Sequence, residues 1–310
     1  MAVTFFEAPL TTRPAAARHA LAVGAASRTA VLVASAAGFA IAFVVAYLLF
    51  VRTEAGQRAE NGVVRSAHSI AKSTVDWATP LRSTDLVVIL GGTAIALVVA
   101  ALVRRRFTVG VSALLLLAAP LALAQLLKLY VLERPEMRDG LGVAGHNSFP
   151  SGHVSAAMAV LFAIAVVLPR KARLPVLLAG AFGAAWVSAS TIALGWHRLS
   201  DTLGGCTLVA AAVCAGAALI SSRRPDGTRI PVVPVLIGLV TPVALVLGGF
   251  AVLSSATSEA ARFVAAMVLA AVSAIVVVVL VAAPLHKVGF DRRIGGSARD
   301  RALIASAARR

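Results

Sequence analysis

The sequence predicts an all-α fold, a polytopic membrane bundle of eight helices, and three observations predict it. Hydrophobic residues make up 59% of the 310-residue chain and charged residues only 14%, with a mean hydropathy of +0.91. Ordinary soluble domains are about 45–50% apolar and about 25% charged. The apolar residues form runs of about 20, the length that crosses a bilayer as a helix. The basic residues gather in short clusters between these runs, as they do in cytoplasmic membrane loops.

The eight apolar runs divide the chain into a core and additions. We predict a cytoplasmic tail over 1–29, a six-span core over 30–221, two further spans within 222–284 and a basic cytoplasmic tail over 285–310. The 152–169 run is the shortest. The runs lie at about 30–51, 84–103, 108–130, 152–169, 174–195, 202–221, 232–253 and 263–284.

The basic clusters set the expected orientation. They lie at 104–106, 170–173, 223–229 and 287–293, which is one face of an eight-span chain. By the positive-inside rule this face is cytoplasmic, together with both termini. The loop 52–83 falls on the other face although it is also basic, and its length weakens the rule there. Because the excess of 29 Lys and Arg over 13 Asp and Glu is shared among membrane loops, we predict no nucleic-acid binding.

Three polar segments fall at the outer ends of the spans. They are 128–135, which contains Lys128, Arg134 and Pro135; 150–153, which reads Pro-Ser-Gly-His; and 190–201. The topology places all three on the same side of the membrane. Ionisable groups at a membrane boundary are functional candidates.

The first two segments predict an anion site. Ser151 and Gly152 directly precede an apolar helix, so their backbone N–H groups can point at an anion, helped by the helix dipole. Lys128 and Arg134 add positive charge, and an arginine can bind phosphate oxygens through two hydrogen bonds.

The third segment predicts a reactive histidine. His197 and Asp201 are four residues apart and share one face of a helical turn. A carboxylate on one imidazole nitrogen leaves the other free as a nucleophile or base, and His153 is then available as the acid for a leaving alcohol. No His, Cys or carboxylate cluster has metal-ligand spacing. The residues therefore indicate metal-independent phosphoryl transfer through histidine, without a cofactor.

These segments resemble the motifs of the type 2 phosphatidic acid phosphatase family, which also includes vanadium haloperoxidases. The family pattern is K-x6-R-P, P-S-G-H and S-R-x5-H-x3-D. The second block matches fully, and the third keeps Ser190, His197 and Asp201. The first block is K-x5-R-P, one residue short, and Thr191 stands where the family has arginine. The resemblance covers roughly residues 30–221 and implies a six-helix phosphatase core.

The resemblance implies a role for each matching residue. His197 would attack phosphorus, Asp201 would orient it, and His153 would protonate the leaving group. The phosphate oxygens would be bound by Lys128, Arg134, Ser151 and Gly152. The family arginine helps to hold the phosphate, and Arg198 is the candidate that replaces it here.

The expected function is therefore an integral membrane lipid phosphate phosphatase with an extracytoplasmic site in the cell membrane. Its partners would be the lipid bilayer and a lipid with a phosphate or diphosphate head: phosphatidate, phosphatidylglycerophosphate, or a polyprenyl phosphate or diphosphate. Two alternatives stay open. One is a non-catalytic carrier or assembly partner with a degenerate pocket. The other is a vanadate-dependent haloperoxidase, against which the membrane spans argue. The oligomeric state is left open.

Overall fold

The computed structural model describes residues 15–70, 72–135, 137, 147–221, 231–286 and 288, and for 15–27, 72–73 and 221 it describes the backbone alone. All regular structure in these residues is helical. The elements are α1 (Ala15–Ala46), η1 (Tyr47–Val51), α2 (Glu54–Ser69), η2 (Lys72–Ser83), α3 (Leu86–Val103), α4 (Phe107–Leu126), η3 (Leu127–Val131), α5 (Gly152–Val167), α6 (Arg170–Ala193), α7 (Leu199–Ser221), α8 (Val232–Ser255) and α9 (Glu259–Leu285).

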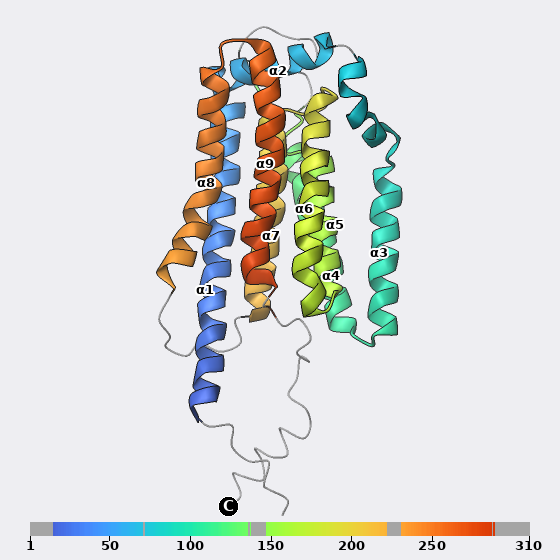
Figure 1. Ribbon diagram of the computed structural model, residues 1–310, viewed down its shortest axis with the longest axis vertical. Helices are drawn as coiled ribbons and strands as arrows, with labels where there is room; N and C mark the ends of the chain where they lie inside the picture. The colour runs from blue at the N-terminus through green and yellow to red at the C-terminus, as the bar shows by residue number, and fades with distance from the viewer. Residues whose placement is uncertain are drawn as a thin grey trace, which may run out of the picture.

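The long helices run side by side and alternate in direction, and this confirms the predicted polytopic bundle (Figure 1). Among the described residues, seven helices are long and apolar enough to cross a membrane. The predicted span that is missing from these seven is the fourth, 152–169, which corresponds to α5; its 16 residues extend only about 24 Å. Most of α5 is buried, so protein rather than lipid surrounds it.

The segment 52–83, predicted as a loop, is helical instead. Thr53 caps α2 by accepting a hydrogen bond from the Gly56 N–H, and η2 follows as a 3₁₀ segment. Both elements lie across one end of the bundle (Figure 1). Helix α1 begins at Ala15, within the predicted tail 1–29, and its candidate membrane span covers Arg28–Val51. The predicted tail 285–310 lies almost wholly outside the described residues.

Helices α8 and α9, which follow the predicted six-span core in the sequence, pack against the helices before them. Helix α8 lies against α1, and α9 lies against α6, α7 and α2. Apolar side chains of α9, such as Ala274 and Val277, share one buried cluster with Val166, Leu177 and Cys214 of α5, α6 and α7. Helix α3 is peripheral and packs mainly against α4 and α5 (Figure 1). The boundaries 30–221 and 222–284 therefore describe sequence segments whose side chains form a common core.

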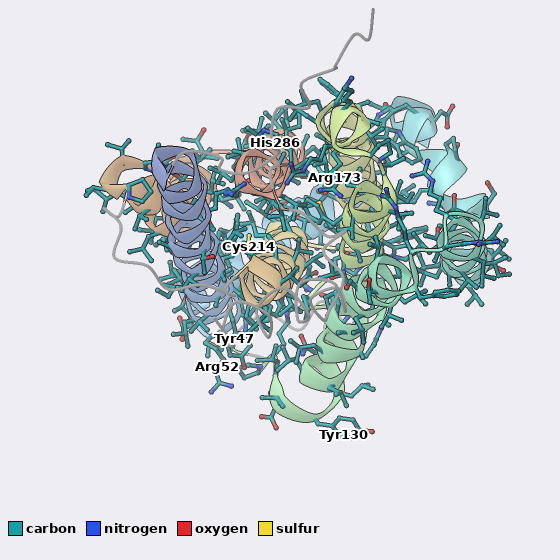
Figure 2. All side chains as sticks on the ribbon, turned by 90° about the horizontal axis from the view of Figure 1, so that it is seen from below. Tyr47, Arg52, Tyr130, Arg173, Cys214 and His286 are labelled. Atoms are coloured by element: carbon teal, nitrogen blue, oxygen red, sulfur yellow. The ribbon has the colours of Figure 1, made fainter. Side chains whose placement is uncertain are left out.

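Arg173 connects several chain segments by hydrogen bonds at the end of the bundle opposite α2. Its side chain is only 2% exposed and lies among the helices (Figure 2), unlike the exposed Lys171 beside it. It donates to the carbonyl oxygens of Val166 and Leu168, where α5 ends, and of Val288, beyond α9. A cation is favourable where helical carbonyls lack partners. The contacts join α5, α6 and the chain after α9.

We expect Arg173→Met to lower the stability of the protein by about 3 kcal/mol, because the substitution leaves buried carbonyl groups without their charged donor. The measurement is thermal unfolding of the purified protein in detergent. Lys171→Met is the matched control and should unfold like the wild type. If the two variants unfold at the same temperature, Arg173 does not fasten these helices.

Candidate active site

The three polar segments meet at the end of the bundle that α2 covers. The Ser151 hydroxyl caps α5 by accepting from the Val154 N–H at 3.4 Å, and the Ser151 N–H donates to the Asp201 carbonyl oxygen at 2.9 Å. This bond ties the start of α5 to the first turn of α7. Gly205 permits the approach, because a Cβ atom there would lie 3.0 Å from the Ser151 carbonyl oxygen. The Ser151 N–H is therefore occupied, whereas the Gly152 and His153 N–H groups lie in the first turn of α5, where N–H groups have no partner within the helix.

His197, the histidine predicted to be reactive, lies on a short turn before α7. Gly195 has φ of +70°, a conformation that glycine adopts without steric cost, and the chain then leads to His197. His197 Nδ1 lies 3.3 Å from Asp201 Oδ2, which also accepts from the Arg198 N–H at 2.9 Å. The second contact is a carboxylate in the first helical turn reaching back to the capping residue. Asp201 is completely buried. It contacts His197 through Nδ1, so the Nε2 atom of His197 takes no part in this contact.

His153 faces His197 from the first turn of α5. The two ring centroids are 6.1 Å apart, and the Trp196 ring lies 5.3 Å from that of His153. Lys128, half-buried in η3, is close enough for its charge to interact with both His153 and Asp201. The structure therefore places Lys128 near His153 and Asp201 although the first block is one residue short.

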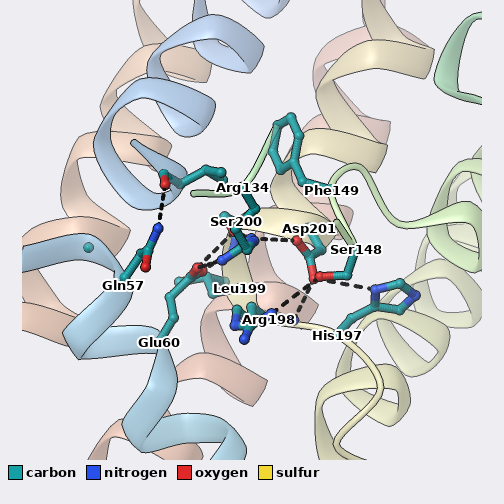
Figure 3. A network of polar contacts seen from close by, with 12 residues as sticks. Gln57, Glu60, Arg134, Ser148, Phe149, His197, Arg198, Leu199, Ser200 and Asp201 are labelled. Atoms are coloured by element: carbon teal, nitrogen blue, oxygen red, sulfur yellow. Dashed lines mark hydrogen bonds and ion pairs between the residues drawn. The ribbon is translucent and has the colours of Figure 1, made fainter. Parts of the chain in front are cut away.

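Arg134 lies between two buried carboxylates (Figure 3). Its Nη2 donates to Asp201 Oδ1 at 3.1 Å, and its Nη1 contacts Glu60 Oε2 at 3.4 Å. The hydroxyl of Ser200 also accepts from Nη2, at 3.4 Å. Only 4% of the Arg134 side chain is exposed, and its Nε atom is buried without a hydrogen-bond partner. The terminal nitrogens of Arg134 are thus held by protein oxygens.

Arg198 points into the same cluster, and Thr191 does not. Arg198 is 6% exposed, its Nη1 donates to the Ser148 hydroxyl at 3.4 Å, and its Nε lacks a partner. The buried Thr191 hydroxyl donates instead to the Ser188 carbonyl oxygen within α6, at 2.9 Å. Thr191 therefore offers its hydroxyl to its own helix, while Arg198 carries the second guanidinium of the cluster.

The family comparison agrees with this geometry. The sequence model of the PAP2 superfamily matches residues 109–226, the stretch that contains all three polar segments. Residues 109–226 belong to the PAP2 superfamily. No curated protein matches the chain, and no solved structure does. PAP2 membership and the membrane-length helices together support a membrane phosphatase-type function.

The PAP2 segment covers α4, α5, α6 and α7, so α1, α2, α3, α8 and α9 lie outside it. Glu60 of α2 nevertheless reaches the site. It is 0% exposed, accepts from the Ser200 N–H at 2.7 Å and from the Ser200 hydroxyl at 3.0 Å. Neither Glu60 nor Ser200 was predicted at the site from the sequence. The spacing of Gln57, Glu60 and Val63 would have indicated an amphipathic helix with Glu60 on its buried face.

Burial is the largest influence on the pKa values of two charged residues at the site, Glu60 and Arg198. Burial raises the pKa of Glu60, and the nearby Arg134 and the Ser200 N–H work against that rise. Burial and the neighbouring Arg134 lower the pKa of Arg198, and the two carboxylates oppose this. Among the described residues, no three His, Cys, Asp or Glu side chains are grouped as metal ligands would be.

Proposed function

We propose that this protein is an integral membrane phosphatase that hydrolyses a lipid phosphate or diphosphate through a phosphohistidine intermediate at the extracytoplasmic face. The observation that carries the proposal is the placement of His197, paired with Asp201 through Nδ1, opposite His153 at a ring separation of 6.1 Å. A phosphoryl group between two such rings is within reach of a nucleophile on one side and an acid on the other.

The proposed steps follow from these positions. His197 Nε2 attacks phosphorus while Asp201 holds the ring and stabilises its positive charge. His153 gives a proton to the leaving oxygen, and a water molecule then attacks the phosphohistidine with His153 as base. Lys128 and the Gly152 and His153 N–H groups at the start of α5 bind the phosphate oxygens. Ser151 contributes by capping α5, and Arg134 and Arg198 contribute positive charge.

The surroundings of Lys128 support a lipid substrate. Leu129, Tyr130 and Val131 of η3 are 67%, 78% and 64% exposed, and Tyr130 lies at the outer edge of the bundle (Figure 2). In a membrane these side chains face lipid. An amphiphile can therefore keep its acyl or prenyl chain in the bilayer while its head reaches Lys128 from the side.

Phosphate release from purified protein tests the proposal. The substrates are phosphatidate, phosphatidylglycerophosphate, a polyprenyl phosphate and a polyprenyl diphosphate, each with and without EDTA, and His197→Ala is the control. We expect release from at least one substrate, unchanged by EDTA and absent in the variant. Activity that EDTA removes and a divalent ion restores would contradict the histidine mechanism. Binding of these lipids without release would favour the non-catalytic carrier.

Cysteine labelling tests the sidedness. Glu133 and Lys171 are both exposed but belong to opposite ends of the bundle, and the native Cys206 and Cys214 are buried. We expect Glu133→Cys to react with an impermeant thiol reagent on intact cells and Lys171→Cys to react only after lysis. The reverse pattern would move the site to the cytoplasmic face.

A further inference from the structure

Glu60 is a buried acid that no step of the proposed reaction uses. It comes from α2, outside the PAP2 segment 109–226, and its carboxylate contacts residues 140 and 74 positions away, Ser200 and Arg134. We propose that Glu60 is a positioning residue that fixes the first turn of α7 and restrains Arg134, and thereby moderates the affinity of the site for phosphate. The inference rests on the proposed phosphatase function.

The contact with Ser200 fixes the first turn of α7. The first N–H groups of a helix have no partner within the helix, and the Ser200 N–H is such a group. Glu60 Oε1 satisfies it at 2.7 Å, and Oε2 accepts from the Ser200 hydroxyl at 3.0 Å. Asp201, the next residue, orients His197. A carboxylate from α2 therefore supports the first turn of α7, from which Asp201 reaches His197.

The contact with Arg134 affects anion binding. Arg134 is shared between Glu60 and Asp201, and its terminal nitrogens face these carboxylates. The buried side chains include two guanidinium groups, Arg134 and Arg198, and two carboxylates, Glu60 and Asp201, so their formal charges cancel. An arriving phosphate must compete with Glu60 for Arg134, and the negative charge of Glu60 repels it. Glu60 thus weakens phosphate binding while it keeps Arg134 in place.

Two substitutions of Glu60 separate the effect of its negative charge from the effect of its side-chain length. Glu60→Gln keeps the size of the side chain and removes the charge, so Arg134 is released toward an anion. Glu60→Asp keeps the charge and shortens the reach to Ser200, so the first turn of α7 is less well fixed. Glu133→Gln removes an exposed carboxylate beside Arg134 and is the matched control.

The test measures vanadate binding through the vanadate-dependent rise in unfolding temperature of the full-length protein, a readout that needs no turnover. We expect Glu60→Gln to bind vanadate about ten-fold more tightly than the wild type. Glu60→Asp should stay within about three-fold of the wild type, and Glu133→Gln should match it. Equal or weaker binding by a folded Glu60→Gln variant would overturn the inference.

Turnover supplies the second readout. We expect both Glu60 variants to lower kcat by at least about ten-fold, so that Glu60→Gln shows tighter anion binding together with slower turnover, a split that simple destabilisation does not produce. Should Glu60→Gln fail to fold, a Glu60→Asp variant with wild-type kcat would overturn the inference. Wild-type protein that hydrolyses no lipid phosphate would refute the proposed function alone, since the vanadate comparison still decides the role of Glu60.

Discussion

Replacing His197 with alanine should abolish phosphate release, by at least about 10⁴-fold, because the variant has no nucleophile to form the covalent intermediate. His197 lies in a turn before α7 and its side chain is 11% exposed, so its loss should leave the helices folded. His68→Ala, which changes an exposed histidine of α2, is the matched control and should retain activity. Turnover of the substrate panel and the unfolding temperature of both variants check this expectation.

His153 should behave differently from His197. As the acid for the leaving oxygen, it matters most when the leaving group is a poor one. We therefore expect His153→Ala to slow hydrolysis of an alkyl phosphate far more than that of an aryl phosphate, whereas His197→Ala removes both activities. Equal losses on the two substrates would contradict the assignment of His153 as the acid.

Arg134→Met should destabilise the protein by roughly 3–5 kcal/mol, because it leaves the completely buried Glu60 and Asp201 without their shared cation. Turnover should fall as well, since Asp201 then loses a partner that holds it beside His197. Thermal unfolding of the purified variants measures the first effect and phosphate release the second.

Two further variants sharpen the test of Arg134. Arg58→Met breaks an ion pair with Glu54 whose side chains are 60% and 58% exposed, and exposed pairs contribute only about 0–1 kcal/mol. Adding Glu60→Gln to Arg134→Met should restore part of the lost stability, because one uncompensated charge disappears. Arg134→Met that unfolds like Arg58→Met would show that the buried ion pairs do not stabilise the fold.

Structural features that depend on residues close together in the chain could be predicted from the sequence. Apolar runs of membrane length predicted the bundle, and each corresponds to a helix. The four-residue spacing of His197 and Asp201 predicted one shared helical face. His197 instead lies in the turn before α7, yet its Nδ1 is 3.3 Å from Asp201 Oδ2. The block at 150–153 predicted the start of a helix, and Ser151 caps α5. Each of these features depends on residues close together in the chain.

Features that depend on distant contacts escaped prediction. Glu60 lies 140 positions from Ser200, so spacing along the chain could not pair them. Reading 52–83 as a loop concealed the buried face of α2 that carries Glu60. Arg173 was predicted among the cytoplasmic loop charges, but the carbonyl groups it meets come from α5 and from beyond α9. In each case tertiary packing, rather than local pattern, determines the role of the charge.

Trapping of the covalent intermediate tests the central claim most directly. The purified protein is mixed with a lipid substrate carrying ³²P in its phosphate, quenched in alkali during turnover, and separated under conditions that preserve phosphohistidine. We expect alkali-stable, acid-labile label on the wild-type protein and on His68→Ala, and none on His197→Ala. Turnover by the wild type without any labelled protein, or label that persists in His197→Ala, would contradict attack by His197.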